Sequence, residues 1–171
     1  MQNKIVIGPE DVHKNLETLA YVWNQLSNRG ATRHSLLINL GGGMVTDLGG
    51  FAAATFKRGI ACINIPTTLL SMIDAAVGGK TGINFNGLKN EIGSFYPADQ
   101  VMIDSQFLKT LDMPNLLSGY GEMLKHGLIS QPSHWSELLT FDFAHIDYAL
   151  LQKLIGQSVQ VKEDIVEKRP L

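Results

Sequence analysis

Three consecutive glycines stand between an apolar segment and a helical pattern, and this feature constrains the fold more than any other. Residues 35–40 read as a buried strand that runs directly into Gly41, Gly42 and Gly43. Residues 43–56 have the pattern of a small-residue helix, and residues 61–65 read as a second strand ended by Pro66. Strand, helix and strand in this order form a parallel crossover unit. Its glycines suit either a phosphate-binding turn at the helix N-terminus or a simple tight turn, because the full spaced glycine fingerprint is absent.

The remaining elements divide the chain into two parts. Further helices are expected at residues 15–28, 69–77, 117–128 and 151–165. Short strands are expected at residues 4–7 and 101–104, and the glycine-rich residues 78–93 read as a loop or a short hairpin. We therefore predict an α/β nucleotide-binding (Rossmann-like) part with parallel strands over residues 1–108, followed by the beginning of an all-α domain over residues 109–171. The last helix runs into Arg169-Pro170-Leu171, as a truncated end would.

Composition excludes several classes of partner. Apolar residues make up 44% of the chain and charged residues 18%, which is typical of a globular protein with one sizeable core. The net charge of -2 comes from mixed charges, so nucleic acid and anionic membranes are not expected partners. No apolar window has the length of a membrane helix, and the start of the chain lacks the core of a signal peptide, so we expect a soluble, cytoplasmic protein. The single cysteine, Cys62, is expected to be a small buried hydrophobe.

Polar side chains follow the glycines and the second strand. Thr67 and Thr68 come directly after that strand, at the sheet edge where the carboxyl ends of parallel strands share one crevice. Both hydroxyls can reach one ligand there, or cap the next helix. Asp47 lies on the first turns of the helix after the glycines, where its carboxylate either binds a cofactor hydroxyl or, more simply, complements the helix dipole.

A second group of polar residues lies in the glycine-rich stretch. Asp74, Lys80, Lys89 and Asn90 fall within 17 residues that carry little other charge. Lysines beside glycine-rich backbone favour an anionic, phosphorylated ligand over a merely solvated surface.

Three residues of the first C-terminal helix share one face. Glu122, Lys125 and His126 are spaced i, i+3 and i+4, a spacing that serves either metal ligation by Glu and His or an exposed Glu–Lys pair. The other histidines have no ligand-like partners and are expected at the surface; they are His13, His34, His134 and His145.

Taken together, seven ordered motifs closely resemble the 3-dehydroquinate synthase family. They are Gly-Gly-Gly-Met-Val-Thr-Asp-Leu-Gly-Gly-Phe at 41–51, Lys-Arg-Gly at 57–59, Ile-Pro-Thr-Thr-Leu-Leu at 65–70, Asp-Ala-Ala-Val-Gly-Gly-Lys-Thr at 74–81, Lys-Asn at 89–90, Phe-Leu-Lys-Thr-Leu at 107–111 and Glu-Met-Leu-Lys-His-Gly at 122–127. The resemblance covers nearly the whole chain.

This resemblance implies an enzyme, a carbon–oxygen lyase that uses NAD and a divalent metal, zinc or cobalt. It converts 3-deoxy-D-arabino-heptulosonate 7-phosphate into 3-dehydroquinate and phosphate, the second step of the shikimate pathway. By the resemblance, cofactor contacts fall on Asp11, Lys14, Gly41, Gly42, Gly43, Asp47, Thr67, Thr68, Lys89, Phe107 and Thr110. Substrate contacts fall on Arg58, Asp74, Lys80, Asn90 and Lys125, and one metal ligand falls on Glu122. The match at Asp11 and Lys14 is the loosest, since Asp replaces the family's Glu and Gly8 is displaced.

The resemblance also implies that part of the site is missing. Family members are longer, and their two metal-binding histidines, with an Arg and an Asn that bind substrate, lie beyond Leu171. Glu122 alone does not supply the three protein ligands of a catalytic zinc. We therefore predict that this chain by itself is inactive. The resemblance separately implies a homodimer, because family members usually pair through the nucleotide domain.

Three other interpretations remain open. A related sugar-phosphate cyclase, such as 2-deoxy-scyllo-inosose synthase or a valiolone-type cyclase, shares the glycine run and the metal carboxylate. A metal-dependent polyol dehydrogenase is a more distant relative. A non-catalytic NAD-binding or dimerisation module would keep the cofactor half alone.

Overall fold

A parallel sheet built around one crossover helix forms the centre of the first part of the molecule. In the computed structural model, which describes residues 3–168, strands β1 (Leu36–Gly41), β2 (Ala61–Pro66) and β5 (Gln100–Val101) lie in the order β1-β2-β5. Both neighbouring pairs are parallel, and helix α2 (Gly43–Thr55) connects β1 to β2. The predicted strand–helix–strand unit is therefore confirmed, with its boundaries shifted by one residue.

One face of this sheet is covered and the other is open. Helix α1 (Leu16–Asn28), capped by the Asn15 side chain, packs with α2 over the covered face, in a core that includes Leu48 and Cys62. Cys62 is fully buried, as predicted. The opposite face shows the apolar side chains of β1, which are 50–57% exposed; they are Leu36, Ile38 and Leu40. Parallel sheets are ordinarily covered on both faces, so this open face is a distinctive feature of the chain.

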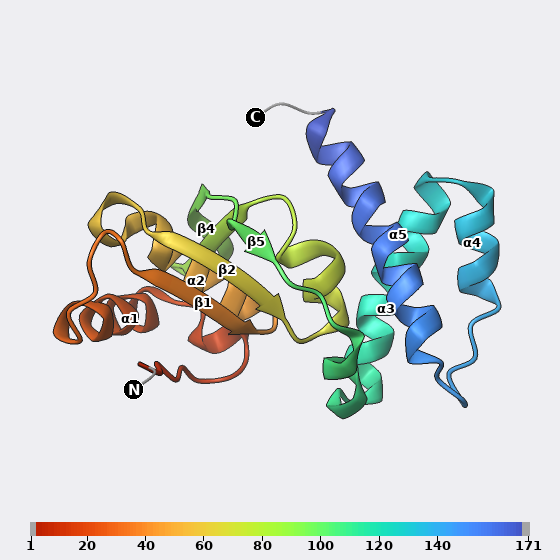
Figure 1. Cartoon of the computed structure of the whole chain (residues 1–171), viewed down its shortest axis with the longest axis horizontal. Coiled ribbons are helices and arrows are strands. Elements are labelled where there is room, and N and C mark those ends of the chain that lie inside the picture. The colour runs from red at the N-terminus through yellow and green to blue at the C-terminus, as the bar shows by residue number, and fades with distance from the viewer. Residues whose placement is uncertain (1–2, 169–171) are drawn as a thin grey trace.

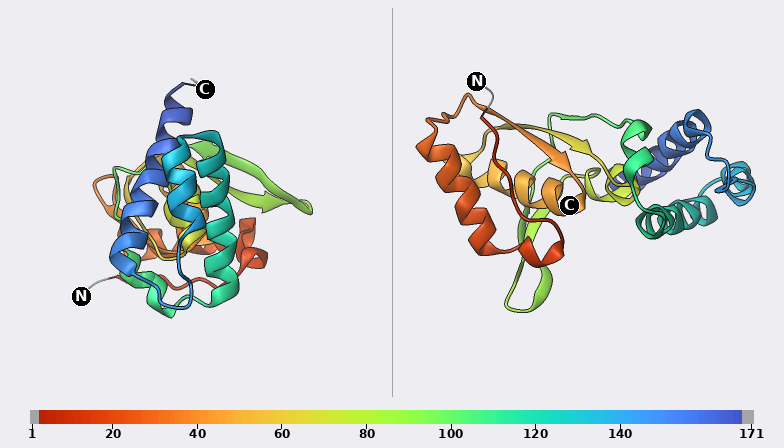
Figure 2. Two further views of the ribbon diagram at one scale, coloured as in Figure 1. Left: turned by 90° about the vertical axis from the view of Figure 1, so that its right-hand side faces the viewer. Right: turned by 90° about the horizontal axis from the view of Figure 1, so that it is seen from below.

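The glycine-rich stretch forms a hairpin. Strands β3 (Lys80–Phe85) and β4 (Leu88–Phe95) pair antiparallel and extend away from the sheet, beside the N-terminal segment that contains the 3-10 turn η1 (Asp11–His13) (Figure 2). The predicted helix at residues 69–77 is shorter: it covers residues 69–75, and all but its first two residues form the π-helix η3 (Ser71–Ala75). The hairpin packs against α2, and the helical segment with η3 follows the carboxyl end of β2 toward the helical part of the chain (Figure 1).

Helices make up the second part. The 3-10 segment η4 (Ser105–Thr110) leads into α3 (Met113–Ile129), α4 (Pro132–Leu139) and α5 (Tyr148–Glu167), which lie together in Figure 1. None of the helices in the described part of the chain has the length and apolar character needed to cross a bilayer. The core of this part also takes in side chains from η3 and the residues just before it, namely Leu69, Met72 and Ile73. A domain boundary near residue 108 therefore stays a prediction.

Several expectations from the sequence are wrong. Residues 4–7 form no strand, because Ile5 and Ile7 pack against the core that includes Leu48 and Cys62, and their backbone pairs with no strand within residues 3–168. The last strand covers only Gln100–Val101, because Asp104 instead caps η4 by accepting from the amide of Gln106. Helix α4 was not predicted, since eight residues give too short a pattern. The expected helix end at residues 169–171 lies outside the described residues.

Candidate cofactor and substrate site

The glycine run places bare backbone at the start of α2. Gly42 is the N-cap residue of α2 and Gly43 its first residue. A β-carbon on Gly42 would lie 3.1 Å from Cγ2 of Thr68, and one on Gly43 would lie 3.1 Å from the β-carbon of Ala75. Because the first amides of a helix have no partner within it, this uncovered N-terminus can receive an anionic group.

A buried lysine gathers two of the candidate ligand residues beside that helix. The ammonium group of Lys14 lies 2.5 Å from Oδ2 of Asp47, on α2, and 2.5 Å from Oδ1 of Asn90, on the hairpin. Lys14 is 5% exposed, so this is an enclosed contact. Burial raises the pKa of Asp47 above its usual value, and the hydrogen bond and charge of Lys14 oppose that rise.

A second ion pair lies on the exposed side of the same cluster. The ammonium group of Lys89 is 3.1 Å from Oδ2 of Asp11. The hydrogen bond from Lys89 is the main reason that the pKa of the Asp11 carboxyl lies below its usual value. Asp11, Lys14, Lys89 and Asn90 come from segments far apart in sequence, and the structure brings all four together with Asp47.

The two threonines after β2 differ in their contacts. The amide of Thr67 donates to the carbonyl oxygen of Gly41 at 2.9 Å, which ties the end of β2 to the glycine run. The hydroxyl of Thr68 donates to the Ser71 hydroxyl at 2.8 Å and accepts from the Ser71 amide at 3.3 Å. Thr68 therefore caps the helical segment that follows, while the Thr67 hydroxyl has no hydrogen bond within residues 3–168.

A row of charged residues continues from this cluster to α3. Asp74 pairs with Lys162 of α5, and Glu122 pairs with Lys125. Glu122 also lies 3.5 Å from Nε2 of His126. The Asp74 charge contributes to raising the pKa of Asp47, and it opposes the lowering of the His126 pKa that burial causes. The ion pair of Asp74 with Lys162 therefore links η3 with α5.

The metal side is incomplete within the part of the chain that the structure describes. No group of three or more histidine, cysteine, aspartate or glutamate side chains that could hold a metal ion exists among residues 3–168. His126 is 1% exposed, and its Nδ1 has no hydrogen-bond partner among the residues that the structure describes. Glu122 with His126 therefore does not fit a complete metal site, and Glu122 can serve only as one ligand of a larger set.

Three predicted contacts are not drawn into the cluster by any hydrogen bond or ion pair within the described residues. Lys80 is an exposed residue at the start of β3. Phe107 and Thr110 are exposed residues of η4, next to α5. They stay predictions from the resemblance.

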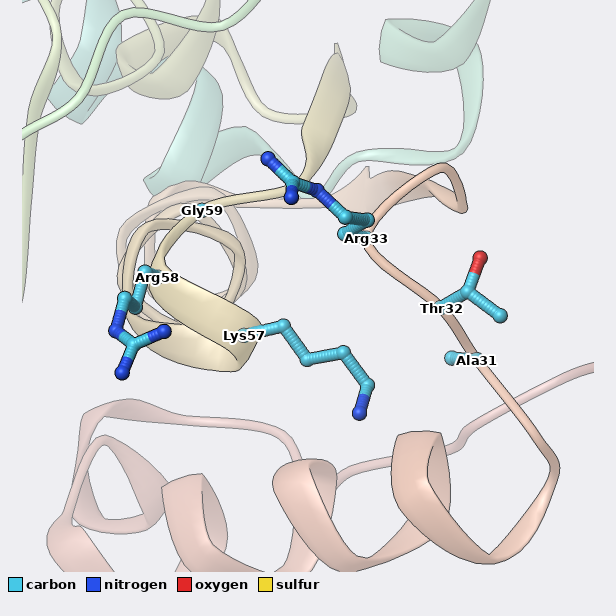
Figure 3. Close-up of a pocket in the computed structure, with 6 residues that line it drawn as sticks. All are labelled: Ala31, Thr32, Arg33, Lys57, Arg58 and Gly59. Atoms are coloured by element: carbon cyan, nitrogen blue, oxygen red, sulfur yellow. The ribbon is translucent and has the colours of Figure 1, made fainter.

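Arg58 lies at the other end of the sheet. It precedes β2 by three residues, whereas the glycine run follows β1, and six-residue parallel strands span roughly 17 Å. Arg58 lines an open pocket of about 580 Å³ with two other cations, Arg33 and Lys57. Figure 3 shows the Lys57 side chain extending toward the segment with Ala31 and Thr32. The structure therefore does not bring Arg58 together with the other predicted substrate contacts of the same chain.

The sequence did not predict the contacts of three further residues, of which Lys162 and Asn84 touch the site and His134 does not. Lys162 lies four residues after the buried Ser158 and therefore on the same face of α5. A charged residue on that buried face was the signal that could have predicted its ion pair with Asp74. Asn84 lies in the hairpin and contacts Asp11, and no local pattern marked it. His134, expected at the surface, is buried and lies 3.1 Å from the Ser158 hydroxyl, because α4 packs against α5. The exposed positions of His13, His34 and His145 agree with the prediction.

The parallel sheet, its crossover helix and the glycine run define an α/β protein of the Rossmann-like nucleotide-binding class. Residues 4–118 match the family model described as 3-dehydroquinate synthase N-terminal. The chain belongs to the 3-dehydroquinate synthase family.

Curated relatives extend this assignment along the chain. The chain is 61% identical to a 3-dehydroquinate synthase of Parabacteroides distasonis, over 97% of this chain and 47% of that protein. It is 44% identical to a 3-dehydroquinate synthase of Pyrococcus furiosus, over 96% of this chain and 48% of that protein. The chain thus spans about half the length of the curated relatives it matches.

Solved structures share the fold. A 2-epi-5-epi-valiolone synthase from Streptomyces hygroscopicus with NAD+ and Zn2+ bound superposes with a TM-score of 0.89 at 30% identity, covering 95% of this chain and 46% of that one. A 2-deoxy-scyllo-inosose synthase complexed with carbaglucose-6-phosphate, NAD+ and Co2+ gives 0.85 at 26% identity, covering 92% and 44%. A glycerol dehydrogenase from Schizosaccharomyces pombe, at 17% identity, a TM-score of 0.65 and coverage of 92% and 45%, shows the fold alone.

Proposed function

We propose that this chain forms the NAD-binding part, and part of the substrate-binding surface, of a 3-dehydroquinate synthase. That lyase converts 3-deoxy-D-arabino-heptulosonate 7-phosphate into 3-dehydroquinate and phosphate. The observation that carries the proposal is the enclosed contact of Lys14 with Asp47 and Asn90 beside the N-terminus of α2. It assembles residues that the family resemblance assigns to cofactor and substrate.

Each part of this cluster suits a dinucleotide. The free amides at the start of α2 suit the pyrophosphate, and the Asp47 carboxylate can accept a hydrogen bond from a hydroxyl group of the cofactor. Lys89, at the exposed side, can meet a phosphate as a point charge. NAD, when bound, supplies a hydride acceptor that the reaction later regenerates. The two cyclase structures with bound NAD+ support this assignment.

The substrate contacts of the proposal are Arg58, Asp74, Lys80, Asn90 and Lys125. Asp74 and Lys125 are paired with Lys162 and Glu122, so these charges are held in place before any ligand arrives. Glu122 would be one ligand of the zinc or cobalt ion. Homodimer formation and a cytoplasmic location belong to the same proposal.

Calorimetric titration with NAD tests the cofactor assignment. The chain should bind NAD, and Asp47→Asn should weaken binding by about tenfold or more, because it removes the charged acceptor. Asp142→Asn is a matched control, since it removes a carboxylate from an exposed pair with His145 in the helical part. Absence of NAD binding by the unaltered chain would contradict the proposal.

A phosphate-release assay with the heptulosonate phosphate, NAD and zinc tests completeness of the site. The chain alone should release no phosphate above background, because Glu122 has too few metal-binding partners within residues 3–168. The intact Parabacteroides distasonis relative serves as the positive control. Turnover by this chain near the rate of that control would show that the predicted inactivity is wrong.

The rival interpretations give different products. The 61% identity to a 3-dehydroquinate synthase, against 30% to the valiolone synthase, favours the heptulosonate phosphate as substrate. Assays of a full-length protein that contains this chain decide between the cyclases when glucose 6-phosphate is offered in parallel. Net accumulation of NADH would instead support a polyol dehydrogenase, because a cyclase regenerates its cofactor. NAD binding without turnover in the full-length protein would support a non-catalytic module.

A further inference from the structure

The hairpin contains a large bulge at the point where two candidate ligand residues lie. Pairing of β3 with β4 runs from Lys80 and Phe95 to Ile83 and Ile92, and it resumes at Phe85 and Leu88. Residues 89–91 of β4 therefore lie opposite the single residue Asn84. Bulges redirect side chains and are frequent beside active sites. Here the bulge carries Lys89 and Asn90 out of the regular ladder.

Asn90 adopts a backbone conformation that its place in the bulge requires. Its φ is 54°, in the left-handed region that asparagine tolerates better than most residues. Its amide cannot follow the regular ladder there, and it donates to Oδ1 of Asn84 at 3.0 Å. The Asn84 side chain thus takes the place of a strand carbonyl.

The remaining polar groups of Asn84 hold the N-terminal segment. Its Nδ2 donates to Oδ2 of Asp11 at 3.1 Å and to the Asp11 carbonyl oxygen at 3.3 Å. Its amide donates to the carbonyl oxygen of Lys14 at 2.8 Å. One residue therefore bonds to Asp11, Lys14 and Asn90, which come from two segments about 70 to 80 residues apart.

We propose that Asn84 is a positioning residue that sets the places of Asp11, Lys14 and Asn90 around the cofactor, an inference that rests on the proposed function. Asn84 acts through these neighbours and needs no contact with NAD itself. Its amide side chain suits the task, because one end accepts from the bulge and the other donates to Asp11. At this position neither Asp nor Leu provides both an acceptor for the Asn90 amide and a donor to Asp11.

The competing explanation is that Asn84 only stabilises the hairpin. A structural role alone predicts that a variant loses stability but keeps the NAD affinity of the folded protein. A positioning role predicts a loss of NAD affinity in protein that remains folded. The two explanations are separated by measuring NAD binding and amide exchange on the same variants.

Asn84→Leu removes all three side-chain hydrogen bonds of Asn84 while keeping a side chain of similar size. We expect hydrogen exchange at the Asn90 amide to speed up by about tenfold without ligand, and the dissociation constant for NAD to rise by about tenfold. Asn86→Asp is the matched control in the same hairpin, because Asn86 lies in the turn and makes no side-chain hydrogen bond among the described residues. It should change neither quantity.

Asn84→Asp covers the case in which Asn84→Leu does not fold. The carboxylate keeps the acceptor for the Asn90 amide, but it repels Asp11 in place of donating to it. Slow exchange at Asn90 should be retained while NAD binding weakens several-fold. An unchanged NAD affinity in folded Asn84→Asp or Asn84→Leu protein would overturn the inference. Failure of the unaltered chain to bind NAD would instead refute the proposed function. NAD binding by the unaltered chain is therefore measured before the variants are compared.

Discussion

The cations at the two ends of the sheet differ in burial and in pairing. At the carboxyl ends of β1 and β2, Lys14 is 5% exposed and contacts both Asp47 and Asn90. At the amino end of β2, Lys57 and Arg58 are exposed and have no carboxylate partner within the described residues. Both ends carry residues that the family resemblance assigns to ligand binding. Only the first end has its charges fixed in advance of a ligand.

This difference separates two kinds of binding residue. A buried cation must be paired, because an isolated charge taken out of water costs several kcal/mol. Lys14 therefore contributes to stability as well as to the proposed site. Exposed cations such as Arg58 contribute little to the stability of the fold. Such residues can therefore be retained by selection for ligand binding alone. Measurements of stability and of binding should consequently diverge at the two ends.

Lys14→Met should show the largest loss of stability. The methionine leaves Asp47 largely buried without its partner, and breaking such a buried pair costs about 3 to 5 kcal/mol in the free energy of unfolding. Urea denaturation measures this change. Lys153→Met is the control, because its ion pair with Glu137 is exposed to solvent and should contribute little to the free energy of unfolding. Equal losses in the two variants would contradict the distinction between the ends.

The loss in Lys14→Met should grow with pH. Burial raises the folded-state pKa of Asp47 above its usual value of 3.8, so the folded chain holds this proton more tightly than the unfolded chain. That contribution to stability is present below pH 3.8 and is lost as pH rises through the folded-state pKa. Lys14 limits the loss, since its hydrogen bond and charge lower the pKa of Asp47. Without Lys14 the stability deficit should be larger at about pH 7 than at about pH 4.

The double variant Lys14→Met with Asp47→Asn isolates this titration. Its deficit relative to the unaltered chain should vary less with pH than that of Lys14→Met, because the unpaired carboxyl is gone. A deficit in Lys14→Met that stays constant between these pH values would show that Asp47 remains hydrated in that variant.

The sequence predicted the sheet but not the contacts that make the cluster. Helix α2 and strands β1 and β2 were predictable, because apolar periodicity and the glycine run are local signals. The contacts of Lys14 with Asp47 and Asn90 span 33 and 76 residues, and no local pattern encodes such distances. Family resemblance assigned these residues to a ligand, but only the fold shows that they hold one another. The bulge opposite Asn84 depends on cross-strand register, which a single strand's pattern does not fix.

Lys89→Ala should have a smaller effect on stability than Lys14→Met. The side chains of Lys89 and Asp11 are 78% and 47% exposed, and exposed ion pairs contribute about 1 kcal/mol or less. NAD affinity should fall several-fold nevertheless, and the difference from the unaltered chain should shrink at high salt, because a phosphate contact is screened. Calorimetric titration at two salt concentrations measures both quantities. An unchanged affinity at low salt would remove Lys89 from the proposed site.

Arg58→Gly should have the smallest effect, and its sign is informative. Arg58 has a φ of 67°, which costs a residue with a β-carbon about 1 kcal/mol that glycine does not incur. Glycine also makes the unfolded chain more flexible, so the net change should lie between zero and a gain of about 1 kcal/mol. Arg58→Ala keeps the β-carbon and should leave stability unchanged in urea denaturation. If both variants lost stability, the guanidinium group would have a structural role, and the contrast between the two ends of the sheet would fail. If neither variant loses stability, the guanidinium group has no structural role in this chain. Arg58 is then retained at a strained position for a contact that the isolated chain does not make.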